Sequence, residues 1–341
     1  MRILRKGPVL TRTLRQLTES AGTWPAPTAM LFDRRKLALA AVVSAVLLAL
    51  LFFLGNFRLP DLSRADPSWL LGVAAAYLLV VIGRGFSLRA LAPEDQRGRM
   101  LQWLQLAGRH QVLFSTIPAG IGDAGFPILA KQIVGIELPV AVRIIAQFRF
   151  RDILFVSTMG MFGLVLLGFP GIYGLLSFAL AIPLLWFSDD IAVALLKLVR
   201  SVAPKIRILA FLQQATDHPR PQARDRCIRT AFAMSVWTAA VAAVISAFRA
   251  IGVHLTIGEA LLFIAAVNIA GAMSLSIAGL GVSEVGAAAA LVTGGMPLQQ
   301  ATSLALVVRP TLMLTIVSMA LLIDVTAGAL KRSGERAFSK P

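Results

Sequence analysis

Long apolar runs separated by short polar loops dominate the chain. Six runs approach or exceed the length of about 20 residues that an α-helix needs to cross a bilayer. They cover residues 37–55, 69–89, 143–167, 172–198, 228–248 and 304–323. This pattern predicts an all-α polytopic membrane protein.

Two further apolar regions, 101–130 and 259–292, are interrupted by glycine-rich turns. The first turn contains Pro118, Gly120 and Gly122, and the second contains Gly279 and Gly281. Such residues break a helix and free backbone groups that only a protein-lined cavity can satisfy. We expect each region to form a re-entrant hairpin that hinges at these residues. Reading both regions as pairs of full spans, which gives eight spans in place of six, is the alternative.

The two interrupted regions resemble each other. Each turn ends in a carboxylate, Asp123 or Glu284, and is followed by a glycine and then an arginine. Gly135 precedes Arg149 by 149 − 135 = 14 residues, and Gly295 precedes Arg309 by 309 − 295 = 14 residues. Matching features in register over about thirty residues indicate an internal repeat.

The basic residues predict the topology. They cluster in the arm 1–36, the loop 92–100, the linker 199–227 and the tail 329–341, all of which we place in the cytoplasm. If the spans are counted from these cytoplasmic loops, the first hairpin enters the membrane from the cytoplasm and the second enters it from outside. The single transmembrane domain, 37–328, is thus predicted to be an inverted repeat with halves of about 101–198 and 228–326.

Composition agrees with a membrane protein, since 57% of residues are hydrophobic and the mean hydropathy is +0.78. A net charge of +16 could indicate nucleic acid, but the basic residues flank apolar segments, so we expect none. One cysteine and three scattered histidines give no disulfide framework and no metal-ligand spacing. We find no nucleotide-binding or nucleophile motif, and we expect neither catalysis nor a cofactor.

Charged residues inside predicted spans mark the candidate site, because burying them is costly without a function. We expect Arg149, Arg151 and Arg309 to hold a phosphate or polar headgroup, while Asp123 and Glu284 sense a cationic head or a proton. Both hairpins would bring these five into one cavity. The competing interpretation makes Arg149 and Asp152, three residues apart, a purely structural ion pair. Arg84, near a span end, is interpreted as a flanking anchor.

Three motifs resemble a known family. They are the run from Ser115 to Asp123, the Arg149-x-Arg151-Asp152 group, and the run from Gly279 to Glu284 followed by Gly295 and Arg309. Over about residues 35–328 the chain resembles the lysylphosphatidylglycerol synthase transmembrane-region family, and the late glycine–glutamate motif is the more specific part. The resemblance implies movement of lipid between leaflets. In two-domain members a soluble aminoacyl-transfer domain follows the membrane part; this chain stops at Pro341, so we do not expect synthase activity.

The sequence therefore predicts a flippase-like lipid transporter of the bacterial inner membrane, with both termini cytoplasmic. Its expected partners are membrane lipids, namely anionic phospholipid, aminoacylated, hopanoid or polyprenyl-linked lipids. A non-catalytic scaffold that presents lipid to a separate glycosyltransferase or lipid-modifying enzyme is the alternative.

Overall fold

A computed structural model describes residues 34–54, 65–116, 121–202, 221–272 and 279–338. Within these ranges every regular element is helical, which confirms the all-α expectation. The α-helices are α3 (Arg34–Leu54), α4 (Pro67–Leu91), α5 (Met100–Thr116), α6 (Ile121–Ile133), α7 (Leu138–Leu166), α8 (Gly171–Trp186), α9 (Ser188–Val202), α11 (Ala223–Ala250), α12 (Ile257–Ala272), α13 (Val282–Thr293) and α14 (Leu298–Phe338). The short 3-10 helix η2 (Glu94–Gln96) lies between α4 and α5.

Helix length distinguishes three described helices from the arms of the predicted hairpins. Three described helices are both long and apolar enough to cross a bilayer: Pro67–Leu91, Ala223–Ala250 and Leu298–Leu330. The arms of the two hairpins, α5/α6 and α12/α13, have 17, 13, 16 and 12 residues. All four are shorter than the ~20 residues that a full crossing needs. These lengths favour the hairpin interpretation over eight spans.

Some boundaries differ from the sequence-based ones. The apolar stretch 172–198 is not one helix, because the chain bends after Trp186 and begins α9 at Ser188. Helix α14 continues through the predicted tail as far as Phe338. Two predicted hinge residues, Pro118 and Gly120, lie outside the described residues.

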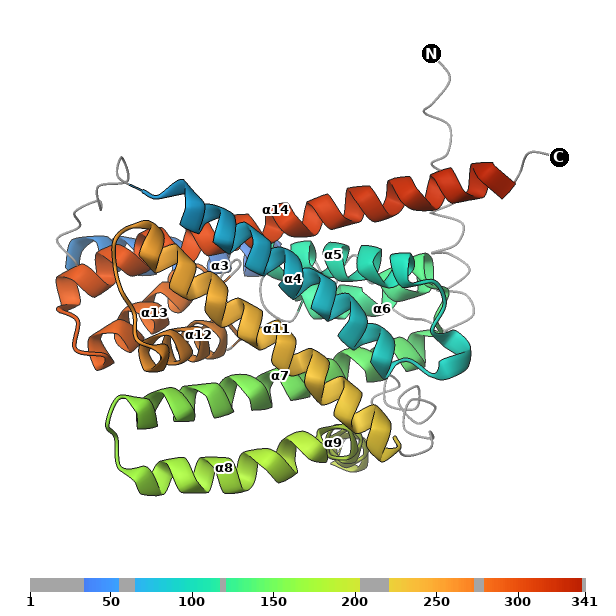
Figure 1. Ribbon diagram of the computed structural model, residues 1–341, viewed down its shortest axis with the longest axis horizontal. Coiled ribbons are helices and arrows are strands. Elements are labelled where there is room, and N and C mark those ends of the chain that lie inside the picture. Colours follow the sequence, from blue (N-terminus) through green and yellow to red (C-terminus); the bar gives the residue numbers. More distant parts are fainter. Residues whose placement is uncertain (1–33, 55–64, 117–120, 203–220, 273–278, 339–341) are drawn as a thin grey trace, which may run out of the picture.

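The order of helix lengths repeats. Helices α4 to α7 run long, short, short, long, and so do α11 to α14. Packing between the halves is reciprocal: α5 of the first hairpin lies against α14, and α12 of the second lies against α7. In Figure 1 the two hairpins lie on opposite sides of α4 and α11, which run side by side between them. We propose, on this basis, that the halves of the predicted repeat begin at α4 and α11.

Matched small residues allow this reciprocal packing. A Cβ on Gly108, the ninth residue of α5, would lie 2.7 Å from the carbonyl oxygen of Ala320 in α14. A Cβ on Gly160 of α7 would lie 2.7 Å from the Cβ of Ala265, the ninth residue of α12. Gly160 and Ala320 are both the twenty-third residue of their helices. Small residues permit close approach of helix backbones in membranes, where van der Waals packing drives association.

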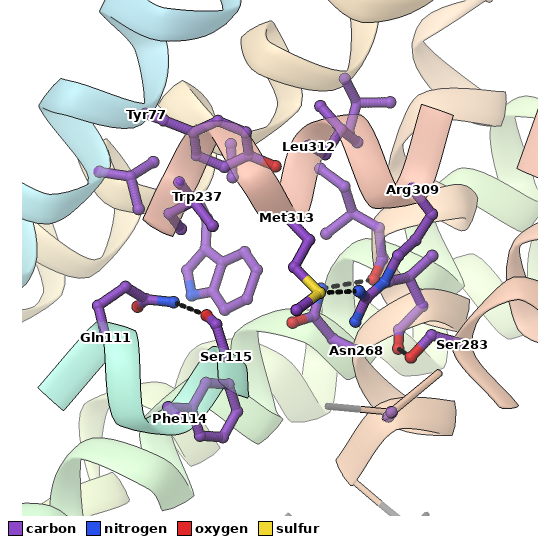
Figure 2. Close-up of a pocket in the computed structure, with 18 of the residues that line it drawn as sticks. Tyr77, Gln111, Phe114, Ser115, Trp237, Asn268, Ser283, Arg309, Leu312 and Met313 are labelled. Atoms are coloured by element: carbon purple, nitrogen blue, oxygen red, sulfur yellow. Dashed lines mark hydrogen bonds between the residues drawn. The ribbon is translucent and has the colours of Figure 1, made fainter. Parts of the chain in front are cut away.

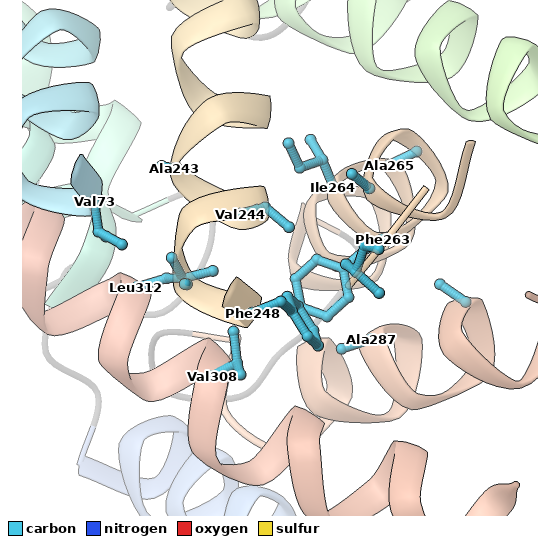
Figure 3. Packing of buried hydrophobic residues seen from close by; sticks show 14 of the residues in the cluster. Val73, Ala243, Val244, Phe248, Phe263, Ile264, Ala265, Ala287, Val308 and Leu312 are labelled. Atoms are coloured by element: carbon cyan, nitrogen blue, oxygen red, sulfur yellow. The ribbon is translucent and has the colours of Figure 1, made fainter. Parts of the chain in front are cut away.

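The largest apolar cluster of the described residues joins six helices, α4, α7, α11, α12, α13 and α14. Val73 of α4, Phe248 of α11, Phe263 of α12, Ala287 of α13 and Leu312 of α14 all belong to it (Figure 3). Phe248 and Phe263 meet edge to face, with ring centroids 5.3 Å apart, a favourable aromatic geometry. The second hairpin is therefore fixed to the α4/α11 pair.

We expect Gly108→Ala to lower stability by about 1–3 kcal/mol, the usual cost of forcing a methyl group into a filled interface. The reason is that the new Cβ would meet the Ala320 backbone oxygen rather than a movable side chain. Unfolding in mixed micelles measures the change. Gly125→Ala is the matched control, since its Cβ would lie 3.6 Å from Leu113, at ordinary contact distance. Equal stability of Gly108→Ala and Gly125→Ala would contradict the packing.

Candidate functional site

The two repeated carboxylates meet the two repeated arginines. Asp123 and Glu284 are each the third residue of the second hairpin arm, α6 or α13. Arg149 and Arg309 are each the twelfth residue of the following long helix, α7 or α14. Asp123 pairs with Arg149 and Glu284 with Arg309, so the internal repeat places the same ion pair in each half.

The first ion pair, Asp123 with Arg149, is held by direct hydrogen bonds. Arg149 donates from Nη2 to Oδ1 of Asp123 at 2.7 Å and from Nε to Oδ2 at 2.8 Å. Its Nη1 lies 3.3 Å from Oδ2 of Asp152, and its guanidinium carbon lies 3.8 Å from the Phe114 ring centroid. His110 Nε2 is 3.0 Å from Asp123 Oδ1. A two-pronged guanidinium–carboxylate contact with added hydrogen bonds is among the strongest polar interactions in proteins. Arg149 therefore belongs to a network that joins α5, α6 and α7.

The second pair is looser. Glu284 is fully buried, and its Oε2 accepts a 2.6 Å hydrogen bond from the backbone N–H of Gly281. The other oxygen, Oε1, has no hydrogen-bond partner among the described residues and lies 3.8 Å from Arg309 Nε. Arg309 Nη1 also contacts the sulfur of Met313 at 2.7 Å, a weak acceptor. The 3.8 Å between Arg309 Nε and Glu284 Oε1 exceeds a hydrogen-bond distance, so this carboxylate oxygen can still accept a hydrogen bond from another donor.

The hinge glycines support this arrangement. Gly279 and Gly281 have φ values of +72° and +86°, which residues with a Cβ rarely adopt. A Cβ on Gly281 would also lie 2.6 Å from the Cβ of Leu47 in α3. Gly122, near the start of α6, allows close approach to the Phe114 backbone, where a Cβ would come within 2.8 Å. The three described hinge residues thus permit tight turns or close contacts at the start of the second arms.

The structure does not bring the five predicted charges into one cavity. Asp123 and Arg149 form one ion pair, Glu284 and Arg309 form another, and Arg151 lies apart from both. Its Nη2 donates to Oδ1 of Asp189 at 2.9 Å, and its Nε donates to Ser188 at 3.1 Å. The other oxygen of Asp189 accepts from Arg229 at 2.7 Å. Adjacent residues of a helix point about 100° apart, so Arg149 and Arg151, two apart, face different neighbours. Arg151 joins α7 to α9 and α11.

A cavity of about 160 Å³ lies between the two hairpins and the helices α4, α11 and α14. Both halves contribute to its wall, as Figure 2 shows. Its polar lining consists of Tyr77, Arg84, Gln111, Ser115, Trp237, Asn268, Ser283 and Arg309. We call it the central pocket. Its described lining contains two arginines and no aspartate or glutamate.

Polar contacts hold the wall of the central pocket in place. Arg84 Nη1 donates to the amide oxygen of Gln111, whose Nε2 donates to Ser115 Oγ at 2.8 Å. Gln111 and Asn268 are each the twelfth residue of the first hairpin arm, α5 or α12. The repeat therefore places an amide on each side of the pocket, in addition to its ion pairs.

Sequence reasoning missed Arg84, which is not a flanking anchor but a buried pocket residue, 8% exposed. The glycines on either side of Arg84, Gly83 and Gly85, are the sequence signal that could have indicated its burial. A Cβ on Gly83 would lie 2.7 Å from Val236 of α11, and one on Gly85 would lie 2.8 Å from Leu104 of α5. Because these glycines bring two helices close, the arginine between them is enclosed. Its Nε has no hydrogen-bond partner among the described residues.

We expect Asp123 and Arg149 to couple by about 1.5–3 kcal/mol, the usual range for hydrogen bonds to charged groups. A double-mutant cycle of Asp123→Asn and Arg149→Gln, followed by unfolding in mixed micelles, measures this free energy. The control pair is Arg109 and Asp324, which meet at 2.8 Å but expose 45% and 20% of their side chains. That exposed pair should couple by less than about 1 kcal/mol. Equal coupling in both cycles would refute the structural role of the Asp123–Arg149 network.

The region that contains this geometry matches a known protein family. The family model described as "Lysylphosphatidylglycerol synthase TM region" matches residues 37–319, which include both hairpins and both ion pairs. No curated protein and no solved structure matches the chain. Residues 37–319 are most of the sequence, and the expected resemblance is confirmed. The chain belongs to the lysylphosphatidylglycerol synthase transmembrane-region family and is a multi-pass, all-helical membrane protein related to membrane lipids.

Proposed function

We propose that this chain binds the phosphate of an amphipathic membrane lipid in the central pocket and moves that lipid between leaflets. One observation carries the proposal: Arg84 and Arg309 line a pocket whose described lining has no acidic residue. Guanidinium groups recognise phosphate through a planar set of donors. Arg84 is buried and forms no ion pair with a described residue, and a buried cation is costly unless an anion compensates it.

The pocket's size suits a headgroup rather than a whole lipid. A volume of about 160 Å³ is below the ~300–1,000 Å³ typical of pockets for drug-sized ligands. The aromatic and aliphatic lining, including Phe114 and Trp237, fits the glycerol and first methylenes beside a phosphate. Acyl chains would then stay between the apolar outer surfaces of the helices and the bilayer.

The two ion pairs supply a means of opening the pocket. Each hairpin is held to the following long helix by its own carboxylate and arginine, and the second pair is the weaker one at 3.8 Å. Protonation of Glu284, or its contact with a cationic headgroup, would release Arg309 toward the pocket. The positive-φ glycines Gly279 and Gly281 lie where the second hairpin would hinge. In this proposal Asp123 and Arg149 form the corresponding closed pair of the first half.

Lipid scrambling by the purified chain tests the proposal. Fluorescent phosphatidylglycerol in proteoliposomes, with a membrane-impermeant quencher outside, reports exchange between leaflets. We expect the wild-type chain to exchange the lipid, and Arg84→Gln and Arg309→Gln to slow exchange about tenfold or more. Loss of a charged hydrogen bond of about 1.5–3 kcal/mol justifies that magnitude.

The control is Arg249→Gln, an exposed arginine over Trp69 near the end of α11 and outside the pocket lining. It should exchange lipid at the wild-type rate. All variants must show the same reconstitution and folded fraction. If the wild-type chain is inert with anionic, aminoacylated and isoprenoid lipids, transport is refuted and the scaffold alternative takes its place. Exchange at the wild-type rate in both pocket variants would refute the role of the central pocket.

A further inference from the structure

A second, larger cavity of about 780 Å³ lies near the end of α4, the first turns of α7 and α11, and α9. It shares no lining residue with the central pocket. We call it the basal cavity. Its charged lining consists of Glu94, Asp95, Arg97, Arg143, Asp189, Asp190, Lys197, Arg224, Asp225 and Arg229. It lies beside the loop 92–100, on the side that the charge pattern predicts to be cytoplasmic.

Arg143 is the unusual member of this lining. Only 6% of its surface is exposed, yet it makes no hydrogen bond or ion pair with any residue in the described ranges. A buried, unpaired guanidinium is costly, and native proteins normally compensate such a charge. Asp189 attracts the Arg143 guanidinium from beyond ion-pair distance, but no described carboxylate binds it directly.

The acidic residues of the basal cavity are mostly engaged by other arginines. Asp189 is held by Arg151 and Arg229 at 2.9 and 2.7 Å. Asp190 lies 2.7 Å from Arg226. Glu94 and Asp225 lie 3.5 and 3.9 Å from Arg97. Of the carboxylates that line the cavity, Asp95 is the exposed one without such a pair in the described structure.

Two further cations extend the positive side of the cavity. Lys197 of α9 and Arg224 of α11 line it, and both are exposed. Neither forms an ion pair with a described residue. Flexible exposed cations around one buried guanidinium can close over a phosphate that has entered from water or from the bilayer surface.

We infer that the basal cavity is a second anion site, in which Arg143 binds the phosphate group of a ligand. This site is additional to the central pocket and does not depend on its proposed function. The shared chemistry is a phosphate, carried either by a soluble compound or by a lipid headgroup. The volume accommodates a phosphorylated organic group as well as phosphate alone.

Thermal unfolding of the full chain in a maltoside detergent tests the inference. One arm adds inorganic phosphate against sodium chloride of equal ionic strength. The other adds short-chain phosphatidylglycerol against diacylglycerol of equal chain length. We expect the wild-type Tm to rise with concentration by several degrees in at least one arm, because binding to the folded state stabilises it. In an Arg84→Gln background, which removes the contribution of the central pocket, Arg143→Gln should lose that rise, and Arg249→Gln should keep it.

A rise with inorganic phosphate identifies a soluble phosphate as sufficient, and a rise with phosphatidylglycerol alone identifies the lipid headgroup. The ligand-free Tm of Arg143→Gln separates binding from a structural role. Because the substitution removes a buried unpaired charge, this Tm should equal or exceed that of the wild type. A lower ligand-free Tm with an unchanged phosphate response would overturn the inference, as would a wild-type Tm that responds in neither arm.

Discussion

A guanidinium enclosed by apolar helices loses its hydration, and the structure depends on how this chain compensates that loss for each buried arginine. Arg149 forms ion pairs with Asp123 and Asp152, and Arg151 and Arg229 both form ion pairs with Asp189. The Arg149–Asp152 contact lies within α7, and each of the other contacts joins two helices. The ion pairs therefore fix the hairpin α5/α6 and helix α9 to the bundle, in addition to compensating charge.

Charge compensation is incomplete for the two buried arginines at which we propose that ligands bind. Arg84 keeps an unpartnered Nε in the central pocket, and Arg143 has no partner among the described residues. The two arginines lie in cavities with no common lining residue. Proteins retain costly buried charges where function uses them. In our proposals both are completed by phosphate, the first during lipid movement and the second at the basal end.

Apolar runs and glycine turns were enough to predict the helical membrane fold, because span length and interrupted hydropathy follow directly from the bilayer. The repeat spacing also predicted that Asp123 and Glu284 would correspond, as would Arg149 and Arg309. Side-chain direction was harder to predict. Arg151 donates a hydrogen bond to Asp189 on α9, 38 residues later in the sequence. No sequence pattern near Arg151 predicts that contact. The distance of Arg84 from the span end predicts a flanking anchor wrongly, because that distance does not reveal the close helix contacts at Gly83 and Gly85.

Photo-crosslinking tests the central claim, that lipid phosphate enters the central pocket, most directly. The probe is phosphatidylglycerol with a diazirine on its glycerol headgroup, reconstituted with the wild-type chain and mapped by peptide mass spectrometry. Our account predicts labels on pocket residues such as Trp237, Asn268 and Met313, and fewer labels there in Arg309→Gln. Labels confined to outward-facing residues such as Leu79 and Leu314, with none in the pocket, would contradict it.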